Sequence, residues 1–175
     1  EEVSAGRKII GLNPGASYGP AKRWPAKKFA MLAAQLHRSP DVVLLLFGTG
    51  ADRQAADEIM AACRDRSRVK DLAGRTSLAQ AMGLIGRCHA FVTNDSGLMH
   101  VAAALATPTV AIFGSTNPVT TGPFSAKSSV VRTELACSPC LEAHCPKKHF
   151  QCMETIAVED VLHAVQHHLF LQAGL

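Results

Sequence analysis

Two stretches of this sequence carry groups suited to holding an anion. In the first, Val92–His100 (VTNDSGLMH), a predicted buried strand runs through Asn-Asp-Ser-Gly directly into a helix of small residues. With Ser96 and Gly97 at the helix start, backbone N–H groups stay free at its positive end. Asp95 could then hydrogen-bond a sugar hydroxyl beside a bound phosphate, and His100, one turn into the helix, could face the same pocket. The alternative is that Asp95 or Ser96 only caps the helix and that His100 is an interior histidine.

The second stretch is the loop Asn13–Trp24 (NPGASYGPAKRW), which follows a short β-branched run. It carries Ser17, Lys22 and Arg23 at the carboxyl end of a predicted strand, the same edge at which the Asp-Ser-Gly turn lies. A lysine ammonium is well suited to a phosphate oxygen. Two candidate anion-binding loops therefore share one edge, although Lys22 and Arg23 would be ordinary solvated charges if the loop bound nothing.

A third loop, Gly48–Arg53 (GTGADR), begins like the G-x-G-x-x-G dinucleotide fingerprint. Arg53 occupies the position of the third glycine, and the loop follows the second predicted strand rather than the first. We therefore reject a nicotinamide site here. Gly48 and Gly50 instead favour a tight turn at the sheet edge, and Asp52 either caps the following helix or accepts a hydrogen bond from a ribose hydroxyl.

The fourth feature is a C-x2-C-x4-C-x6-C run with two histidines inside it, formed by Cys137, Cys140, His144, Cys145, His149 and Cys152. Four thiols this close together are typical of a zinc or iron–sulfur site. However, a second C-x-x-C pair is missing, and Pro139 and Pro146 indicate a stiff loop. From the sequence, these thiols could bind a metal, form disulfides or only pack. Cys63 and Cys88 are predicted to be core thiols.

The elements that position these loops are short apolar runs alternating with stretches of helical periodicity. The predicted strands are 8–13, 42–47, 69–72, 90–93 and 109–113, and the predicted helices are 25–38, 52–63, 77–86 and 97–105. This β-α repetition favours an α/β fold with a Rossmann-like parallel sheet and helices on both faces. Ligands of such sheets bind outside the carboxyl ends of the strands.

The last third of the chain departs from this alternation. Residues 114–127 are rich in Gly, Pro, Ser and Thr, and 129–132 is predicted to be one more strand. Residues 133–153 are predicted to form a Cys-rich loop, and 158–171 a final helix that packs back on the sheet. We therefore predict a single domain over residues 1–175.

Length and composition limit the class of protein. At 175 residues and 18.6 kDa, the chain fits one ordinary domain and is too short for a self-contained two-domain enzyme. It begins at Glu1 without an initiator Met, so we expect a piece of a longer protein. No run approaches the roughly 18 apolar residues of a membrane span, and no signal peptide is recognised, which favours reduced cysteines.

The charge is uneven along the chain. The net charge is +4, and the first 38 residues hold seven Lys or Arg against two acids. A general nucleic-acid binder more often has a basic stripe across the whole domain with exposed aromatic residues, which are only 5% here. The local basic excess fits a small anion better than a nucleic acid.

Taken together, the motifs NPGASYGPAKRWP, DSGLMHVAAAL, VAIFGSTNP and CSPCLEAHCPKKHFQC resemble a known family. The chain is similar to the C-terminal half of ADP-heptose:lipopolysaccharide heptosyltransferases, most closely the heptosyltransferase II type, in glycosyltransferase family 9. The resemblance covers essentially the whole chain. It implies a two-domain GT-B fold in which this chain is the C-terminal, nucleotide-sugar-binding domain.

The resemblance also assigns roles to individual residues. It implies that Lys22 contacts the diphosphate of the donor, with Ser17 nearby, and that Asp95 holds the heptose or its phosphate. It places Ser96, Gly97 and His100 at the phosphate-binding helix start, Thr76 and Leu78 in the adenine-facing segment, and Asp52 near the ribose. The general base belongs to the other half of the protein, so no residue here takes that role.

The activity that the resemblance implies is inverting, metal-independent transfer of heptose from ADP-heptose to the lipopolysaccharide inner core. Lys22 and the helix start would stabilise the departing ADP. We expect no cofactor, no metal and no nucleic-acid partner, and a nucleotide-binding chain that turns over nothing alone. The acceptor would bind through the other half, in the cytoplasm or peripherally at the inner face of the inner membrane.

Two alternatives stay open at this point. One is another GT-B nucleotide-sugar protein, such as a UDP-sugar 2-epimerase. The other is a non-catalytic nucleotide-binding or metal-stabilised interaction module in which the cysteine loop is the partner surface. If Lys22 meets the diphosphate, its loss should weaken ADP binding and leave the melting temperature nearly unchanged.

Overall fold

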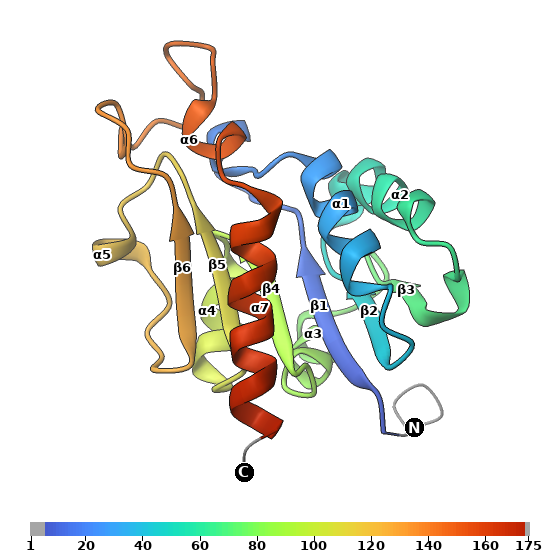
Figure 1. Cartoon of the computed structure of the whole chain (residues 1–175). Coiled ribbons are helices and arrows are strands. Elements are labelled where there is room, and N and C mark those ends of the chain that lie inside the picture. Colours follow the sequence, from blue (N-terminus) through green and yellow to red (C-terminus); the bar gives the residue numbers. More distant parts are fainter. Residues whose placement is uncertain (1–5, 174–175) are drawn as a thin grey trace.

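The computed structural model describes residues 6–173. At its centre is a six-stranded sheet of order β3-β2-β1-β4-β5-β6, in which every neighbouring pair is parallel (Figure 1). The strands are β1 (Lys8–Asn13), β2 (Val42–Leu46), β3 (Val69–Asp71), β4 (Ala90–Asn94), β5 (Thr109–Phe113) and β6 (Ser128–Arg132). The predicted parallel sheet is confirmed, and each predicted strand end lies within one residue of the observed end.

Helices cover both faces of the sheet, as predicted. One face carries α1 (Ala26–Leu36), α2 (Arg53–Ala62) and α7 (Val158–Ala173), and the other carries α3 (Leu78–Ile85) and α4 (Gly97–Ala104). Successive strand residues point to opposite faces, so Leu44 packs toward α1 while Val43 and Leu45 pack toward α3. Both faces are dry, which explains the all-apolar sequence of β2. Burying one such side chain stabilises the fold by about 1.5–3 kcal/mol.

Several very short elements lie outside the predictions. They are the helices α5 (Pro118–Thr121) and α6 (Gln151–Glu154) and the 3-10 turns η1 (Pro20–Lys22), η2 (Gly50–Asp52) and η3 (Arg66–Arg68). The prediction that 133–153 is entirely a loop is wrong for residues 151–153, because Phe150 adopts a left-handed conformation that starts α6. This helical turn buries Cys152 and Met153 in the core.

The strand order creates a crevice at one edge of the sheet. After β1 the sheet grows outward through β2 and β3, whereas β4, β5 and β6 extend it from the opposite side of β1. The loops that follow β1 and β4 therefore diverge at the carboxyl edge, which is where parallel α/β sheets bind ligands.

No helix within residues 6–173 has the length and apolar character needed to cross a membrane.

Candidate functional site

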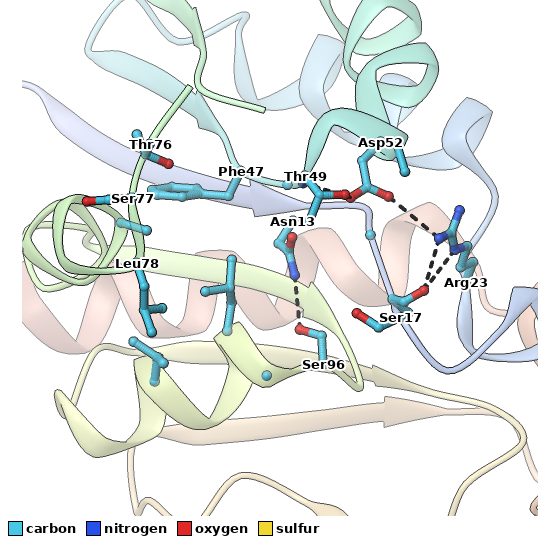
Figure 2. Close-up of a pocket in the computed structure, with 18 residues that line it drawn as sticks. Asn13, Ser17, Arg23, Phe47, Thr49, Asp52, Thr76, Ser77, Leu78 and Ser96 are labelled. Atoms are coloured by element: carbon cyan, nitrogen blue, oxygen red, sulfur yellow. Dashed lines mark hydrogen bonds and ion pairs between the residues drawn. The ribbon is translucent and has the colours of Figure 1, made fainter. Parts of the chain in front are cut away.

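A pocket of about 610 Å³ opens at the carboxyl ends of the central strands (Figure 2). The loop after β1, the loop after β2 and the starts of α3 and α4 form its wall. Of the nine predicted binding residues, six line this pocket: Ser17, Asp52, Thr76, Leu78, Ser96 and Gly97. The other three, Lys22, Asp95 and His100, lie outside its lining.

One end of the pocket is apolar. Phe47, Leu78, Ala81, Leu98 and Val101 line it, and the Leu78 side chain is 62% exposed. This exposed leucine is fixed at the first position of α3, because a capping box between the side chains and backbone groups of the two residues Ser77 and Gln80 starts the helix there. Exposed leucine beside small and aromatic side chains offers a flat apolar surface of the kind that a nucleobase covers.

The start of α4 lies at the polar end of the pocket. Ser96 is the N-cap residue, but its side chain makes no capping hydrogen bond. Its hydroxyl instead lies 3.0 Å from the Thr93 hydroxyl and accepts a hydrogen bond from Asn13 Nδ2 at 3.0 Å (Figure 2). The first N–H groups of α4 therefore have no side-chain cap and stay available to an anion. Ser96 thus holds the N-cap position, but the alternative that the side chain of Asp95 or Ser96 caps the helix is wrong, because neither side chain makes a capping hydrogen bond to α4.

Asp52 is buried beneath the loop that follows β2. Its Oδ2 accepts hydrogen bonds from the backbone N–H of Thr49 at 2.9 Å and from the Thr49 hydroxyl at 2.8 Å. Asp52 therefore closes the capping box of η2, whose N-cap is Thr49. It also stands at the N-cap position of α2, as the sequence suggested, but its side chain makes no capping bond there. The other oxygen, Oδ1, lies 3.7 Å from a guanidinium nitrogen of Arg23. A β-carbon at Gly15 would come within 2.6 Å of this carboxylate, so glycine is required there.

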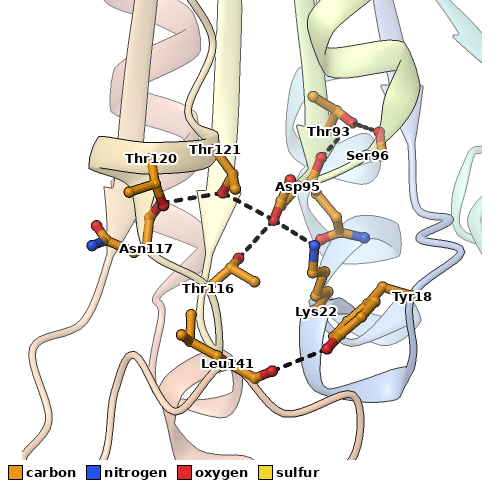
Figure 3. Close-up of polar contacts among 11 residues, drawn as sticks. Tyr18, Lys22, Thr93, Asp95, Ser96, Thr116, Asn117, Thr120, Thr121 and Leu141 are labelled. Carbon is orange, nitrogen blue, oxygen red and sulfur yellow. Dashed lines mark hydrogen bonds and ion pairs between the residues drawn. The ribbon is translucent and has the colours of Figure 1, made fainter.

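Lys22 and Asp95 form an ion pair just outside the pocket lining (Figure 3). Lys22 Nζ lies 2.7 Å from Asp95 Oδ2, and the two side chains are only 13% and 6% exposed. The hydroxyl of Thr116 donates to the same oxygen at 2.7 Å. The Lys22 ammonium also lies 4.7 Å from the centre of the Tyr18 ring. The alternative that Lys22 is an ordinary solvated charge is therefore wrong.

An asparagine at the end of β4 ties the loop after β1 to the sheet. Asn94 accepts a hydrogen bond from the backbone N–H of Trp24 at 3.0 Å and donates to the carbonyl of Pro14 at 2.8 Å. Arg23 closes the same loop by donating to the carbonyl of Ala16 through two nitrogens, at 3.0 and 3.1 Å. These bonds hold both ends of the segment that carries Ser17 and Lys22.

His100 is exposed on α4 and does not line the pocket. Gly97, Leu98 and Val101 are the residues of α4 that line the pocket, so the place of His100 at the phosphate-binding helix start stays a prediction. The basic residues near the N-terminus are also less available than their number suggests. Besides Lys22, the Lys28 ammonium is engaged within the protein, because it donates hydrogen bonds to the carbonyls of Glu154 and Ile156.

The cysteines are all free thiols in the structure. Cys63 and Cys88 are buried, which confirms them as core thiols. Hydrogen bonds from backbone N–H groups, chiefly that of Phe150, lower the pKa of Cys145, whereas burial raises the pKa of Cys152. Within residues 6–173, no group of three or more His, Cys, Asp or Glu side chains is arranged to hold a metal ion. The other three thiols of the run, Cys137, Cys140 and Cys145, lie near enough to Cys152 to add to the rise of its pKa. The four thiols therefore gather in space, but among the described residues they are not arranged as a metal site.

Sequence reasoning missed several residues that build the site. They are Asn13, Tyr18, Thr49, Asn94 and Thr116. Their positions at the carboxyl ends of strands or in the adjoining loops were the available signal, since that edge was already predicted to bind the ligand. Their partners could not be identified, because most of them lie far away along the chain.

Comparisons with known proteins agree with this arrangement. A lipooligosaccharide heptosyltransferase 2 of Campylobacter jejuni is 41% identical over 160 residues, which are 90% of this chain and 50% of that protein. The lipopolysaccharide heptosyltransferase 2 of Escherichia coli K12 is 48% identical over 132 residues, 74% of this chain and 38% of that protein. The solved structure of the E. coli ADP-heptose LPS heptosyltransferase II matches with a TM-score of 0.84 and 41% identity, covering 97% of this chain and 49% of that chain.

The chain thus spans about half the length, or less, of the relatives it matches. Its sheet and helices are those of one half of a GT-B glycosyltransferase. The model of glycosyltransferase family 9 (heptosyltransferase) matches residues 1–151, which include every residue of the pocket and of the Lys22–Asp95 ion pair. The chain therefore belongs to glycosyltransferase family 9, the heptosyltransferase family.

Proposed function

We propose that residues 1–175 form the donor-binding domain of a heptosyltransferase that transfers heptose from ADP-heptose to the lipopolysaccharide inner core. The observation that carries this proposal is the pocket itself. An apolar surface for a base and an uncapped helix start for phosphates face one cavity of about 610 Å³, and a buried ion pair lies beside it. The names of the relatives supply the sugar and the acceptor class.

The lining suggests how ADP would lie. Adenine would cover Leu78, with Thr76 at its edge. The ribose would lie near Asp52. Among the described residues its Oδ1 has only the distant Arg23 guanidinium as a partner, so it can accept a hydroxyl hydrogen bond. The diphosphate would then reach Ser17 and the free N–H groups at Ser96 and Gly97.

The heptose would lie toward the Lys22–Asp95 pair. Asp95 Oδ2 already accepts from Lys22 and Thr116, whereas no hydrogen bond to Oδ1 is found among the described residues. Oδ1 is thus the oxygen that can accept from a sugar hydroxyl. Lys22, held beside it, would share its charge with the diphosphate as negative charge builds on the departing ADP, which lowers the barrier electrostatically.

The rest of the reaction belongs to the other half of the protein. We propose that the general base and the acceptor site lie there, that transfer inverts the anomeric centre, and that this chain alone binds nucleotide without turnover. The whole protein would work in the cytoplasm, with peripheral association at the inner membrane where its acceptor is made. Mixing the chain with its N-terminal half should restore transfer that neither part shows alone.

A nucleotide panel tests the proposal. Isothermal titration calorimetry of the chain with ADP, ADP-heptose and UDP should show binding of the adenine nucleotides and weaker binding of UDP. Preference for UDP would favour an epimerase-like GT-B protein instead. Absence of any nucleotide binding would refute donor binding and leave a non-catalytic interaction module.

A matched pair of variants tests the placement of the base. Leu78→Asp should weaken ADP binding about tenfold, because it removes roughly the apolar contact area of one side chain from the base. Met82→Asp is the control, since Met82 is also partly exposed on α3 but does not line the pocket. Equal effects of the two substitutions would contradict adenine at Leu78.

A further inference from the structure

The cysteine-bearing loop, residues 133–150, has no role in the donor site described above. It nevertheless crosses the carboxyl edge of the sheet and lies beside the turn that follows β1 (Figure 1). We propose that this loop is a positioning element for Lys22, acting mainly through the backbone of Leu141 and Ala143. The inference rests on the proposed function, because it takes Lys22 as a ligand of the donor diphosphate.

Leu141 bridges the two loops that converge on Asp95. Its backbone N–H donates to the carbonyl of Ser115 at 2.7 Å, and its carbonyl accepts from the Tyr18 hydroxyl at 3.1 Å (Figure 3). A left-handed backbone conformation, with φ of 62°, lets one residue make both bonds. A non-glycine residue rarely adopts this conformation unless the surrounding contacts hold it there.

A second contact fixes the turn that carries Lys22. The backbone N–H of Ala21 donates to the carbonyl of Ala143 at 3.1 Å. This carbonyl also occupies the space that a β-carbon on Gly19 would need, so the loop and the turn are packed backbone against backbone. Gly19 is the N-cap of η1, whose last residue is Lys22.

The contacts close a ring around the ion pair. Lys22 and Thr116 approach Asp95 Oδ2 from the two sides, each at 2.7 Å. Ser115, next to Thr116, and Tyr18, four residues before Lys22, are both bonded to Leu141. The Ser138 hydroxyl adds a bond to the carbonyl of Gly114 at 2.7 Å on the Thr116 side. The ring therefore fixes the distance between the two loops, and with it the place of the lysine ammonium.

A purely structural loop would behave differently from a positioning loop. Loosening a structural loop would lower stability and weaken all ligands of the pocket alike. Loosening a loop that positions Lys22 would weaken only the ligands that need the lysine, namely those with a diphosphate, and the effect would vanish once Lys22 is removed. Comparing ADP with adenosine in the presence and absence of Lys22 separates these possibilities.

Two variants loosen the loop to different degrees. Tyr18→Phe removes the hydrogen bond from the Tyr18 hydroxyl to the Leu141 carbonyl. It keeps an aromatic ring beside the Lys22 ammonium. Gly19→Ala pushes the turn away from Ala143. The control is Gly83→Ala in α3, where an added β-carbon meets nothing within 4 Å and the glycine does not line the pocket.

Titration of the chain with ADP and with adenosine is the test. We expect Tyr18→Phe to raise the Kd for ADP about threefold to tenfold, the effect of one net hydrogen bond, and Gly19→Ala to raise it further. The Kd for adenosine should not change, Gly83→Ala should match the wild type, and neither loop variant should weaken ADP further in a Lys22→Ala background.

Three results would overturn the inference: an unchanged Kd for ADP in Tyr18→Phe, equal losses for ADP and adenosine, or the full loss persisting without Lys22. If Gly19→Ala does not fold, Tyr18→Phe decides alone. A wild-type chain that binds neither ligand would overturn the proposed function, and the inference with it. A wild-type chain that binds ADP, with loop variants that bind it equally well, rejects only the role of the loop.

Discussion

Lys22 Nζ and Asp95 Oδ2 are 2.7 Å apart in a region where both side chains are largely buried. A buried ion pair adds little to stability when it is intact, but loss of one partner leaves the other charge stranded. Asp95 keeps a hydrogen bond from Thr116 in any Lys22 variant, which reduces that penalty. Removal of Lys22 should therefore lower the free energy of unfolding, whereas removal of a solvated loop lysine would not.

Lys22→Ala should both weaken ADP binding and lower stability. We expect destabilisation of about 1–3 kcal/mol, less than for a fully buried pair, and a Tm lower by about 2–10 °C. This replaces the expectation from the sequence that Tm stays nearly unchanged. Differential scanning calorimetry would measure it, with exposed Lys27→Ala as the control and Lys22→Ala/Asp95→Asn, which removes the stranded charge, as the partial rescue. A Tm equal to that of Lys27→Ala would contradict the buried pair.

Gly97→Ala should separate folding from binding. An added β-carbon at this first residue of α4 meets nothing within 4 Å, so stability should stay level or rise by up to about 1 kcal/mol. The methyl group would nevertheless stand where a phosphate approaches the helix start, so ADP affinity should fall about tenfold or more. Urea unfolding and calorimetry would measure the two effects, with Gly83→Ala as a helix control that alters only stability. Unchanged ADP affinity would remove the helix start from the site.

The thiols should differ in their reactivity toward iodoacetamide. Backbone N–H groups lower the pKa of Cys145, so it retains more thiolate as the pH falls and should be labelled first. Burial raises the pKa of Cys88 to about 12, and it should be labelled last. Peptide mass spectrometry after brief alkylation near neutral pH would give the order. Labelling of Cys88 before Cys145 would show that the environments of these two thiols are different from those described.

Acid should destabilise the protein partly through His168. Burial lowers the pKa of this imidazole, whose Nε2 lies 3.0 Å from the Ser129 hydroxyl. The folded-state pKa is below the unfolded value of 6.5, so the contribution to stability is complete above pH 6.5 and is lost as the pH falls through the folded pKa. His168→Gln should show a smaller loss of urea stability between about pH 7.5 and about pH 5.5. An equal loss in the variant and the wild type would exclude His168 as a source of the acid sensitivity.

The sheet could be predicted because its strands are short runs rich in apolar and β-branched residues, of which Val42–Leu46 is wholly apolar. Such runs follow from burial on both faces of the sheet, which is complete for β2, β4 and β5. The helices α5 and α6 could not be predicted, because four residues are too few to show a helical period of apolar residues. The start of α6 depends on the left-handed Phe150, a conformation that tertiary contacts impose and that no local residue preference favours.

Only the location of the site, at the carboxyl edge of the sheet, could be predicted from the sequence. Strand ends and helix starts indicated where Lys22 and Asp95 would lie, but not that they would neutralise each other, because 73 residues separate them. The same reason hid the bond from Asn13 to Thr93. His100 shows a second limit: it is exposed and does not line the pocket, although it belongs to the motif at the start of α4. A motif fixes the position of a residue along a helix, while packing of that helix decides which way its side chain points.

Trp24 can serve as an intrinsic fluorescent probe of the loop that carries Lys22, because Asn94 anchors this loop through the backbone N–H of Trp24. Trp24 is the only tryptophan of the chain and is 1% exposed, with its indole N–H bonded to the carbonyl of Ile156 and its ring edge-on to Phe29 at 5.0 Å. It lies two residues after Lys22, in the loop that Asn94 anchors. Its fluorescence thus comes from one environment only, and changes in emission on adding nucleotide would report directly on the loop that carries the lysine.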